Sequence, residues 1–328
     1  MHPCEYLLMK RGSVRSRLAV IAGLGCVAAA LAGCTATGQM ALGSGPSVQA
    51  LTVSTDTTTE STVSFPTPLL PSRAQCREIV AGTGPRVQPG DVVEVAVSLY
   101  LGATGEKLVS VGYDSSKPAK YVPVSASAAD VVSAGLRCGS RGSRLAVAIP
   151  HSASIANVTA LGLIDSQKTR LTDPQQLGLG SGEGFVQVMD IKRVFPGKAT
   201  GAPQITRDGF PAVALAPNGT PGITIPKKPT PTKMELEILK AGAGPVIGEK
   251  STVLVHIASA NWSTGAANST WQSGAPQPVS LAQEDPSLVK LLSGVKVGSQ
   301  VGVILPTPAS EGQAADASFL VIDILGIL

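Results

Sequence analysis

The sequence predicts an α+β chain in which a disordered N-terminal tether precedes two tandem domains, each a curled antiparallel sheet over one short helix. Three observations predict this fold class. The chain contains two blocks that carry the same motifs in the same order. Each block has long segments in which apolar and polar residues alternate, as in half-buried strands. Each block also has one short stretch bounded by helix-capping residues.

The two blocks are related by an internal duplication. Residues 81–85, Ala-Gly-Thr-Gly-Pro, correspond to residues 241–245, Ala-Gly-Ala-Gly-Pro. Residues 142–150 correspond to residues 298–306, and both segments begin with Gly-Ser and end in proline. The last strand of each block holds a Val-x-Asp-Ile motif, at 188–191 and 321–324. Because the order of these features is preserved, one architecture is predicted for both blocks.

Strands and one helix are expected in each block. The clearest strands are residues 92–101 and 185–194 in the first block, and 252–259 and 318–325 in the second. The first helix is predicted at 127–134, ending at Gly135. In the second block Asp285 is a suitable N-cap, Pro286 suits the first helical position and Gly294 ends the helix.

The domain limits follow from changes in composition. Residues 1–33 are expected to be a signal peptide, and residues 34–72, rich in Thr, Ser, Gly, Ala and Pro, a flexible tether. The first domain is predicted at 73–195 and the second at 233–328. Between them, residues 196–232 are rich in Pro and Gly and are expected to form a semi-rigid extended connector.

Composition argues for a folded chain and against a nucleic-acid partner. Of the 328 residues only 15% are charged and 3% are aromatic. The formal net charge is +4, and four of the basic residues against one acidic residue lie in residues 1–33, leaving about +1 for the rest. Since no basic run remains to neutralise phosphates, nucleic acid is excluded as a partner.

The N-terminus is typical of an exported lipoprotein. A basic stretch, Lys10 to Arg17, precedes an apolar run, Leu18 to Leu31, of about 14 residues, which is too short to span a bilayer. The run ends Leu-Ala-Gly-Cys, which resembles the lipobox of bacterial lipoproteins and implies lipidation of Cys34. The chain is therefore expected to be exported and anchored by lipid to the outer side of the cell membrane. The alternative is an ordinary secretory signal followed by a chance cysteine.

Two cysteines remain in the predicted domains. Cys4 and Cys26 belong to the signal peptide, and Cys34 is the lipidation site. Cys76 and Cys138 form an even pair in an oxidising compartment, so a disulfide between them is predicted, with two buried free thiols as the alternative. No metal site and no cofactor are expected, because the remaining histidines are far in sequence from both cysteines.

The order of motifs resembles the FKBP-type peptidyl-prolyl isomerases, and bacterial (actinobacterial) lipoproteins with two such domains in particular. The resemblance rests on Gly-x-Gly after the first strand, Gly-Ser-Arg before a strand that ends in proline, and Asp-Ile in the last strand; it covers about residues 74–195 and 233–328. It implies a sheet in which the first strand lies beside the strand after the helix, which would bring Cys76 near Cys138. It also implies a dry pocket that lowers the barrier to X–Pro rotation without a nucleophile or a metal.

The family's pocket positions can be carried over one by one. In the second block they fall on Ile257, Ala267, Asn268, Leu288, Glu311 and Leu320. In the first block they fall on Val97, Leu108, Val109 and Val132. Nearly every aromatic residue of the family's pocket is replaced at these positions. A shifted alignment would bring Tyr113 and Asp114 into the first pocket; otherwise they are loop residues.

Two functions follow from the resemblance. The first is a peptidyl-prolyl isomerase-like protein that acts on X–Pro bonds, or as a folding helper, in the cell envelope. The second is an inactive FKBP-like binding or chaperone module, favoured by the missing aromatic residues. Either would be a monomer whose partner is a proline-containing peptide or an unfolded envelope protein. A third, an adhesion-type sandwich, would lack the two short helices.

Overall fold

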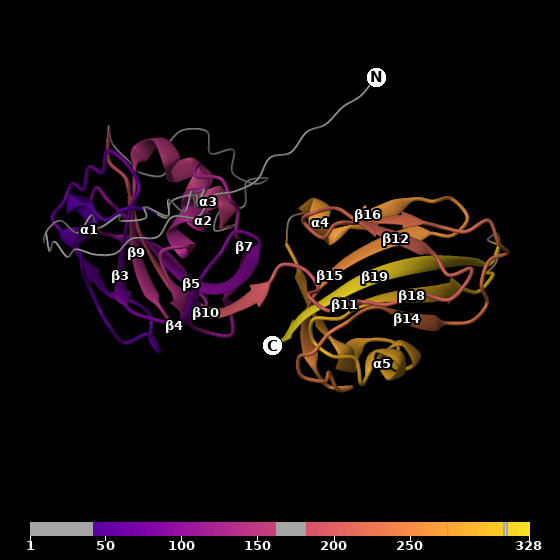
Figure 1. Ribbon diagram of the computed structural model, residues 1–328. Helices are drawn as coiled ribbons and strands as arrows, with labels where there is room; N and C mark the ends of the chain where they lie inside the picture. The colour runs from indigo at the N-terminus through magenta and orange to yellow at the C-terminus, as the bar shows by residue number, and fades with distance from the viewer. Residues whose placement is uncertain (1–41, 162–181, 274, 311, 313) are drawn as a thin grey trace, which may run out of the picture. The chain divides into compact units, whose positions relative to one another are not determined.

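The computed structural model describes residues 42–161, 182–273, 275–310, 312 and 314–328 (Figure 1). The predicted signal peptide, the lipidation site Cys34 and the candidate pocket residue Glu311 lie outside these residues. In the described part of the chain, no helix combines the length and the apolar character needed to cross a membrane.

The first domain is built on a six-stranded antiparallel sheet. Its strands run in the order β3-β9-β10-β5-β6, and β7 also pairs with β5. Their bounds are β3 Gln75–Val80, β5 Asp91–Leu101, β6 Lys107–Val111, β7 Lys120–Pro123, β9 Arg144–Ile149 and β10 Phe185–Pro196. A short ladder joins β4 (Thr83–Arg86) to β8 (Ser140–Arg141). The helical elements are α2 Val131–Leu136, η1 His151–Ala153 and α3 Ser154–Ala160.

The second domain repeats this order. Its sheet runs β11-β14-β18-β19-β15-β16, and β17 pairs with β15 as β7 does with β5. The bounds are β11 Ala202–Pro203, β14 Glu235–Ala241, β15 Thr252–Asn261, β16 Ala267–Ser269, β17 Gln277–Ser280, β18 Gln300–Thr307 and β19 Asp316–Ile327. The helical elements are α4 Thr270–Ser273, η3 Leu281–Gln283 and α5 Pro286–Leu292. The matching strand orders confirm the fold class predicted from the repeated motifs.

The two helices differ in how well they were predicted. In α5, Asp285 accepts hydrogen bonds from Ser287 N and Leu288 N, and Pro286 is the first helical residue, as expected. The first helix begins later than predicted, because Asp130 is its N-cap and accepts from Ser133 N. It also continues through Gly135 to Leu136, since Gly135 is buried in the helix and packs against Met189 and Val147. The presence of both helices distinguishes the fold from a sandwich.

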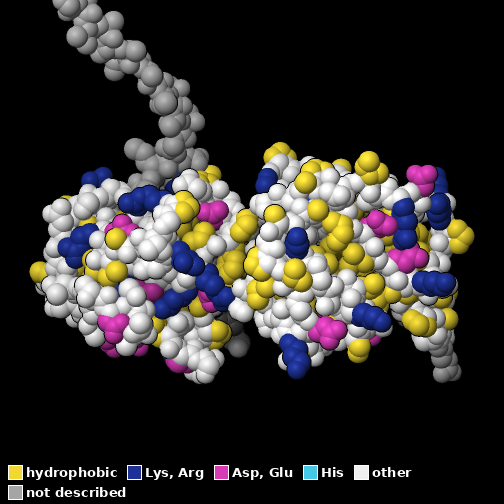
Figure 2. Space-filling model, turned by 60° about the horizontal axis from the view of Figure 1, so that its bottom comes forward, with side chains coloured by type: hydrophobic (Ala, Val, Ile, Leu, Met, Phe, Trp, Pro, Cys, Tyr) yellow, Lys and Arg dark blue, Asp and Glu magenta, His cyan; other side chains and the backbone are white. Residues whose placement is uncertain are grey.

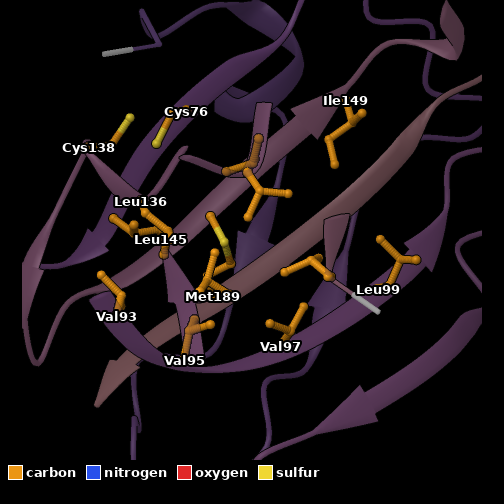
Figure 3. Packing of buried hydrophobic residues seen from close by; sticks show 14 of the residues in the cluster. Cys76, Val93, Val95, Val97, Leu99, Leu136, Cys138, Leu145, Ile149 and Met189 are labelled. Carbon is orange, nitrogen blue, oxygen red and sulfur yellow. The ribbon is translucent and has the colours of Figure 1, made fainter. Parts of the chain in front are cut away.

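The inner face of each sheet holds the main core. In the first domain α2 and α3 cover this face (Figure 1), and Figure 3 shows Leu136 of α2 beside Leu145 and Met189. In the second domain α5 lies against the sheet, and its Val289 and Leu292 join the core around Val301 and Ile324. The alternation along each strand places the intervening residues on the outer face.

The expected tether differs from the structure over residues 42–72. Its beginning, 34–41, lies outside the described residues. Leu42 packs against the inner core, and most of the rest packs on the outer face of the first sheet. It forms α1 (Pro46–Gln49) and the hairpin β1 (Thr52–Val53) with β2 (Val63–Ser64). Val48 is fully buried and Leu51 nearly so, in a cluster with Val186 and Val188 of β10. We call residues 42–72 the first strap. It is ordered because a sheet that is apolar on both faces needs a cover on each.

The connector 196–232 also differs from a plain extended linker. It contributes β11 to the second sheet and forms a hairpin of β12 (Ala212–Leu215) with β13 (Pro221–Thr224). Phe210 is buried against Phe319 of β19 with ring centroids 5.3 Å apart. We call residues 199–230 the second strap, since they cover the outer face of the second sheet as the first strap covers the first.

A buried acid ties each strap to its sheet. In the first domain Asp190 accepts from Arg144 Nε at 2.7 Å and from Arg144 Nη2 at 2.6 Å. Arg144, whose side chain has no exposed surface, also donates to the carbonyls of Ser54 and Thr59 in the first strap. In the second domain the matching Asp323 accepts from Gln300 Nε2 and from the backbone N–H of Ala199, both at 2.7 Å. Both aspartates are therefore structural.

The charged surface is mixed. Lys and Arg side chains lie among Asp and Glu on the face shown in Figure 2 and do not merge into one basic area. On this face the mixed distribution agrees with the low net charge of the predicted domains.

Candidate functional site

The second domain encloses an apolar cavity between α5 and the inner face of its sheet. Its volume is about 180 Å³. The walls come from β15, α5, β18 and β19 and are aliphatic, and among the described lining residues only Glu284 is charged. Three of the predicted pocket residues meet there: Ile257, Leu288 and Leu320. They are partly buried and pack against the core, so the cavity opens from the core toward the surface.

A second hollow adjoins this cavity. It has a volume of about 600 Å³ and shares Ile257 with the apolar cavity. The predicted residue Asn268, on β16, lines it together with hydroxyl and amide side chains. Ala267, also on β16, is exposed and lines neither space. The two adjoining spaces, one aliphatic and one polar, form the candidate site.

The predicted pocket positions of the first domain do not meet in one cavity; among them Val132 lines a hollow of about 250 Å³ between α2 and α3. Val97 of β5 and Val132 of α2 are both buried in the core, and Val109 packs against it. The insert after β9 adds α3, which brings Val158 into the same core, followed by Leu161. Leu108 points away and is 42% exposed. Val97 and Val109 therefore serve packing.

Tyr113 and Asp114 do not line a pocket. The Tyr113 hydroxyl donates to Asp190 Oδ2 at 2.8 Å, which places this ring beside the buried acid that holds the first strap. Burial, and then the charge of Asp190, raises the pKa of Tyr113. Asp114 is exposed and accepts from Ser116 N and Lys117 N within its own turn. The shifted alignment is thus not supported.

The tryptophans of the second domain are also structural. Trp262 is buried, and its indole Nε1 donates to the carbonyl of Lys228 in the second strap. Trp271 stacks on His256 with ring centroids 4.4 Å apart. His256 is buried, and burial lowers its pKa to about 4, so the ring is neutral at pH 7. Its Nδ1 lies 2.8 Å from Thr270 Oγ1, which fixes the ring rather than freeing it for catalysis.

The predicted disulfide is not formed in the structure. Cys76 and Cys138 are buried free thiols that lie side by side at one end of the first core (Figure 3). A hydrogen bond with Cys138, together with burial, raises the pKa of Cys76. Cys138 Sγ also contacts the carbonyls of Leu42 and Ala134, both at 3.6 Å. The strand order implied by the resemblance predicted that the two cysteines would be close together. In the structure they are two free thiols, which was the alternative to the disulfide.

Sequence reasoning missed two buried amides in the first domain. Gln187 of β10 has no exposed surface and Asn157 of α3 is 2% exposed. Within the described residues, neither side-chain amide has a hydrogen-bond partner. The duplication could have indicated Gln187, because it stands three residues before Asp190, as Leu320 stands three before Asp323.

The order of the strands identifies the fold of both domains. Each sheet places its first strand, β3 or β14, beside the strand that follows the helix, β9 or β18. This is the arrangement that the resemblance implies. Both domains have an FKBP-like fold.

Comparisons with solved structures give FKBP proteins as well. The three FKBP domains of wheat FKBP73 match 78% of this chain and 94% of their own, at 11% identity and a TM-score of 0.30. FkpA from Escherichia coli matches 37% of the chain at 14% identity and a TM-score of 0.26. A putative peptidyl-prolyl cis-trans isomerase FKBP12 from Mycobacterium tuberculosis matches 30% of the chain and 86% of its own, at 21% identity and a TM-score of 0.24.

The FKBP-like chain spans about half the length of some of these proteins, namely 53% of FkpA and 47% of a multi-domain immunophilin from Arabidopsis thaliana. No family model and no curated protein matches it.

Proposed function

We propose that the second FKBP-like domain binds a proline-containing segment of an unfolded envelope protein or peptide, with the proline ring in the aliphatic cavity. The observation that carries this proposal is the cavity of about 180 Å³ lined by Ile257, Leu288 and Leu320. This is smaller than the ~300 Å³ at which sites for drug-sized ligands begin, so it suits one ring or one side chain. Proline fits because it is apolar and its backbone is already restricted, which lowers the entropy lost on binding.

Isomerisation of the bound X–Pro bond is a second function that the same cavity supports. Rotation requires loss of amide resonance, against a barrier of about 20 kcal/mol. A twisted amide is less dipolar than a planar one, and an apolar wall therefore favours it. The cavity is aliphatic, and its described lining residues include no aromatic ring and no donor for the amide carbonyl. We therefore place binding before catalysis.

Peptide binding and exchange can be measured together by NMR on the full chain. Ala-Leu-Pro-Phe is expected to shift the signals of Ile257, Leu288 and Leu320, and Ala-Leu-Ala-Phe is not. Leu288→Trp fills the cavity, so we expect it to weaken binding at least tenfold. The matched control is Ile205→Trp, because Ile205 is 99% exposed, and this variant should bind as the unchanged chain does. The protein used must include the first strap, because the strap belongs to the fold of the first domain.

Equal binding of the two peptides, or unchanged binding in Leu288→Trp with an otherwise unchanged spectrum, would contradict the proposal. Faster cis–trans exchange of the bound proline peptide would add catalysis to it. Binding without faster cis–trans exchange would support a binding module that has no isomerase activity.

We also propose that the chain is exported and anchored to the cell membrane through lipid on Cys34. The basic stretch, the short apolar run and the Leu-Ala-Gly-Cys sequence support this proposal. The full chain produced in a bacterium is expected to enter the detergent phase on Triton X-114 separation. Cys34→Ser should move it to the aqueous phase, whereas Cys26→Ser should not. Aqueous partition of the unchanged chain would contradict the anchor.

A further inference from the structure

Cys76 and Cys138 form a pair of thiols inside the first domain. Cys76, on β3, is 4% exposed, and Cys138, two residues after α2, is 8% exposed. Both sulfur atoms contact the last turn of α2. Cys76 Sγ lies 3.9 Å from the carbonyl oxygen of Gly135, and Cys138 Sγ lies 3.6 Å from that of Ala134. The two thiols therefore share one small space, in which they lie side by side (Figure 3).

The start of the first strap covers this space. The carbonyl oxygen of Leu42 lies 3.6 Å from Cys138 Sγ, and the backbone N–H of Cys76 donates to the carbonyl of Gly43 at 3.1 Å. The side chain of Leu42 packs against the inner core of the same domain. A ligand held between the two sulfur atoms would therefore be shielded from water.

The charged side chains around the pair carry one net positive charge, from two arginines and one glutamate. Arg86 donates through Nη1 to the carbonyl of Cys138, and its Nη2 lies 3.6 Å from Glu78 Oε2. A hydrogen bond from Cys76, and then the charges of Arg86 and Arg137, lower the pKa of Cys138. An anionic group between the two sulfur atoms would thus have an opposite charge nearby.

The number of available ligands restricts the kind of ion that the pair can hold. Among the residues that the structure describes, no group of three or more His, Cys, Asp and Glu side chains could hold a metal ion. Structural Zn²⁺ sites need four protein ligands, and Fe–S clusters are also held by four. Of the metals that thiolates select, Cu⁺ is the one that two thiolates satisfy, because it accepts a linear arrangement of two sulfur ligands.

We propose that Cys76 and Cys138 bind one Cu⁺ ion as a two-coordinate dithiolate site in the first domain. This site is independent of the proposed function, which belongs to the second domain. On binding, each thiol loses its proton to water and forms one sulfur–copper bond, and no electron is transferred. Two thiolates and one Cu⁺ carry one net negative charge, which the net positive charge of Arg86, Arg137 and Glu78 offsets.

The test uses the full chain with serine in place of the cysteines at 4, 26 and 34, so that the pair provides its only thiols. After reduction, and without oxygen, this chain is expected to withdraw one equivalent of Cu⁺ from its coloured bicinchoninate complex. Cys76→Ala and Cys138→Ala should each weaken binding at least hundredfold. Met189→Leu is the matched control, because it removes a buried sulfur atom from the same core with little change of volume, and it should keep the full equivalent.

The pH dependence provides a readout that a purely structural role of the cysteines would not give. Because two protons leave, the apparent affinity for Cu⁺ should rise about hundredfold from pH 5 to pH 6. A tenfold rise would indicate one thiolate and overturn the proposal. Unchanged binding in Cys76→Ala or Cys138→Ala, or loss of binding in Met189→Leu, would overturn it as well. A Cys76–Cys138 disulfide in the chain that bacteria export would also overturn it, since no thiolate would remain.

Discussion

Asp190→Ala is expected to lower the free energy of unfolding of the first domain by about 3–5 kcal/mol, the usual cost of leaving a buried charge without its partner. Arg144 has no exposed surface, and its two strongest contacts are the carboxylate oxygens of Asp190. The alanine would leave a buried guanidinium whose remaining hydrogen-bond partners are the carbonyls of Ser54 and Thr59 and the hydroxyl of Ser54, all in the first strap. Urea unfolding, followed by signals of the first domain, measures the loss.

The same variant should loosen the first strap before the sheet unfolds. Arg144 donates to the carbonyls of Ser54 and Thr59, and these bonds hold the hairpin of β1 and β2 against the sheet. Amide protons of residues 52–64 are therefore expected to exchange faster in Asp190→Ala than those of β5 and β9.

Two further variants test the cause. Glu106→Ala removes an exposed carboxylate of the same domain and should change stability by less than about 0.5 kcal/mol. Asp190→Ala/Arg144→Met removes both charges and should recover much of the loss, since an apolar pair in place of a buried ion pair is often tolerated. A loss below about 1 kcal/mol in Asp190→Ala would show that water compensates the guanidinium, contrary to its burial.

The sheets could be predicted from the sequence because the patterns that indicate their strands are local and occur in both domains. Alternation located the long strands, and the preserved order of motifs located the second domain once the first was recognised. Asp285 and Pro286 predicted the start of α5, because capping depends on neighbours in sequence. In the first domain the cap, Asp130, lies inside a run of small residues, and the helix start was placed too early.

The straps were missed because their apolar residues are few and widely spaced. Val48, Leu51 and Leu69 show no helix or strand period, and they are buried only against a sheet far away in sequence. One indication was available in β10. Val186 and Val188 face the first strap while Phe185 and Met189 face the inner core, so the strand is apolar on both faces. Such a strand requires a cover on each side, and the nearest unassigned segment was the expected tether.

The candidate site was predicted in one domain and not in the other. Motif positions placed Ile257, Leu288 and Leu320 together, since the second domain has no large insert between β18 and β19. In the first domain the insert after β9 supplies α3, whose Val158 fills the core. No local pattern indicated which surface this helix would cover. The packing of an insert depends on the whole domain, and a single sequence does not encode it locally.

Gln187→Leu is expected to raise the free energy of unfolding of the first domain by about 1–3 kcal/mol, the usual cost of an unpaired buried polar group. Gln187 is fully buried on the inner face of β10, opposite Leu99 and Val147, and neither amide atom has a partner within the described residues. The second domain already has leucine, Leu320, at the corresponding position. A shift of several degrees in the melting temperature of the first domain is therefore expected.

Gln75→Leu is the matched control, because it makes the same substitution in the same domain at a glutamine that does have partners. Gln75 is 3% exposed, and its Oε1 accepts from the backbone N–H of Ser47 at 2.9 Å in the first strap. Leucine there would leave that N–H unpaired, so stability should fall by about 1–3 kcal/mol. Burial and residue type are alike in the two variants, and only the hydrogen bonding differs. A gain of stability in Gln187→Leu and a loss in Gln75→Leu would show that the hydrogen bonding of the glutamine determines the effect. A loss in Gln187→Leu as well would show that an enclosed water satisfies the Gln187 amide, and that the polar residue stabilises the first domain where the second uses an apolar one.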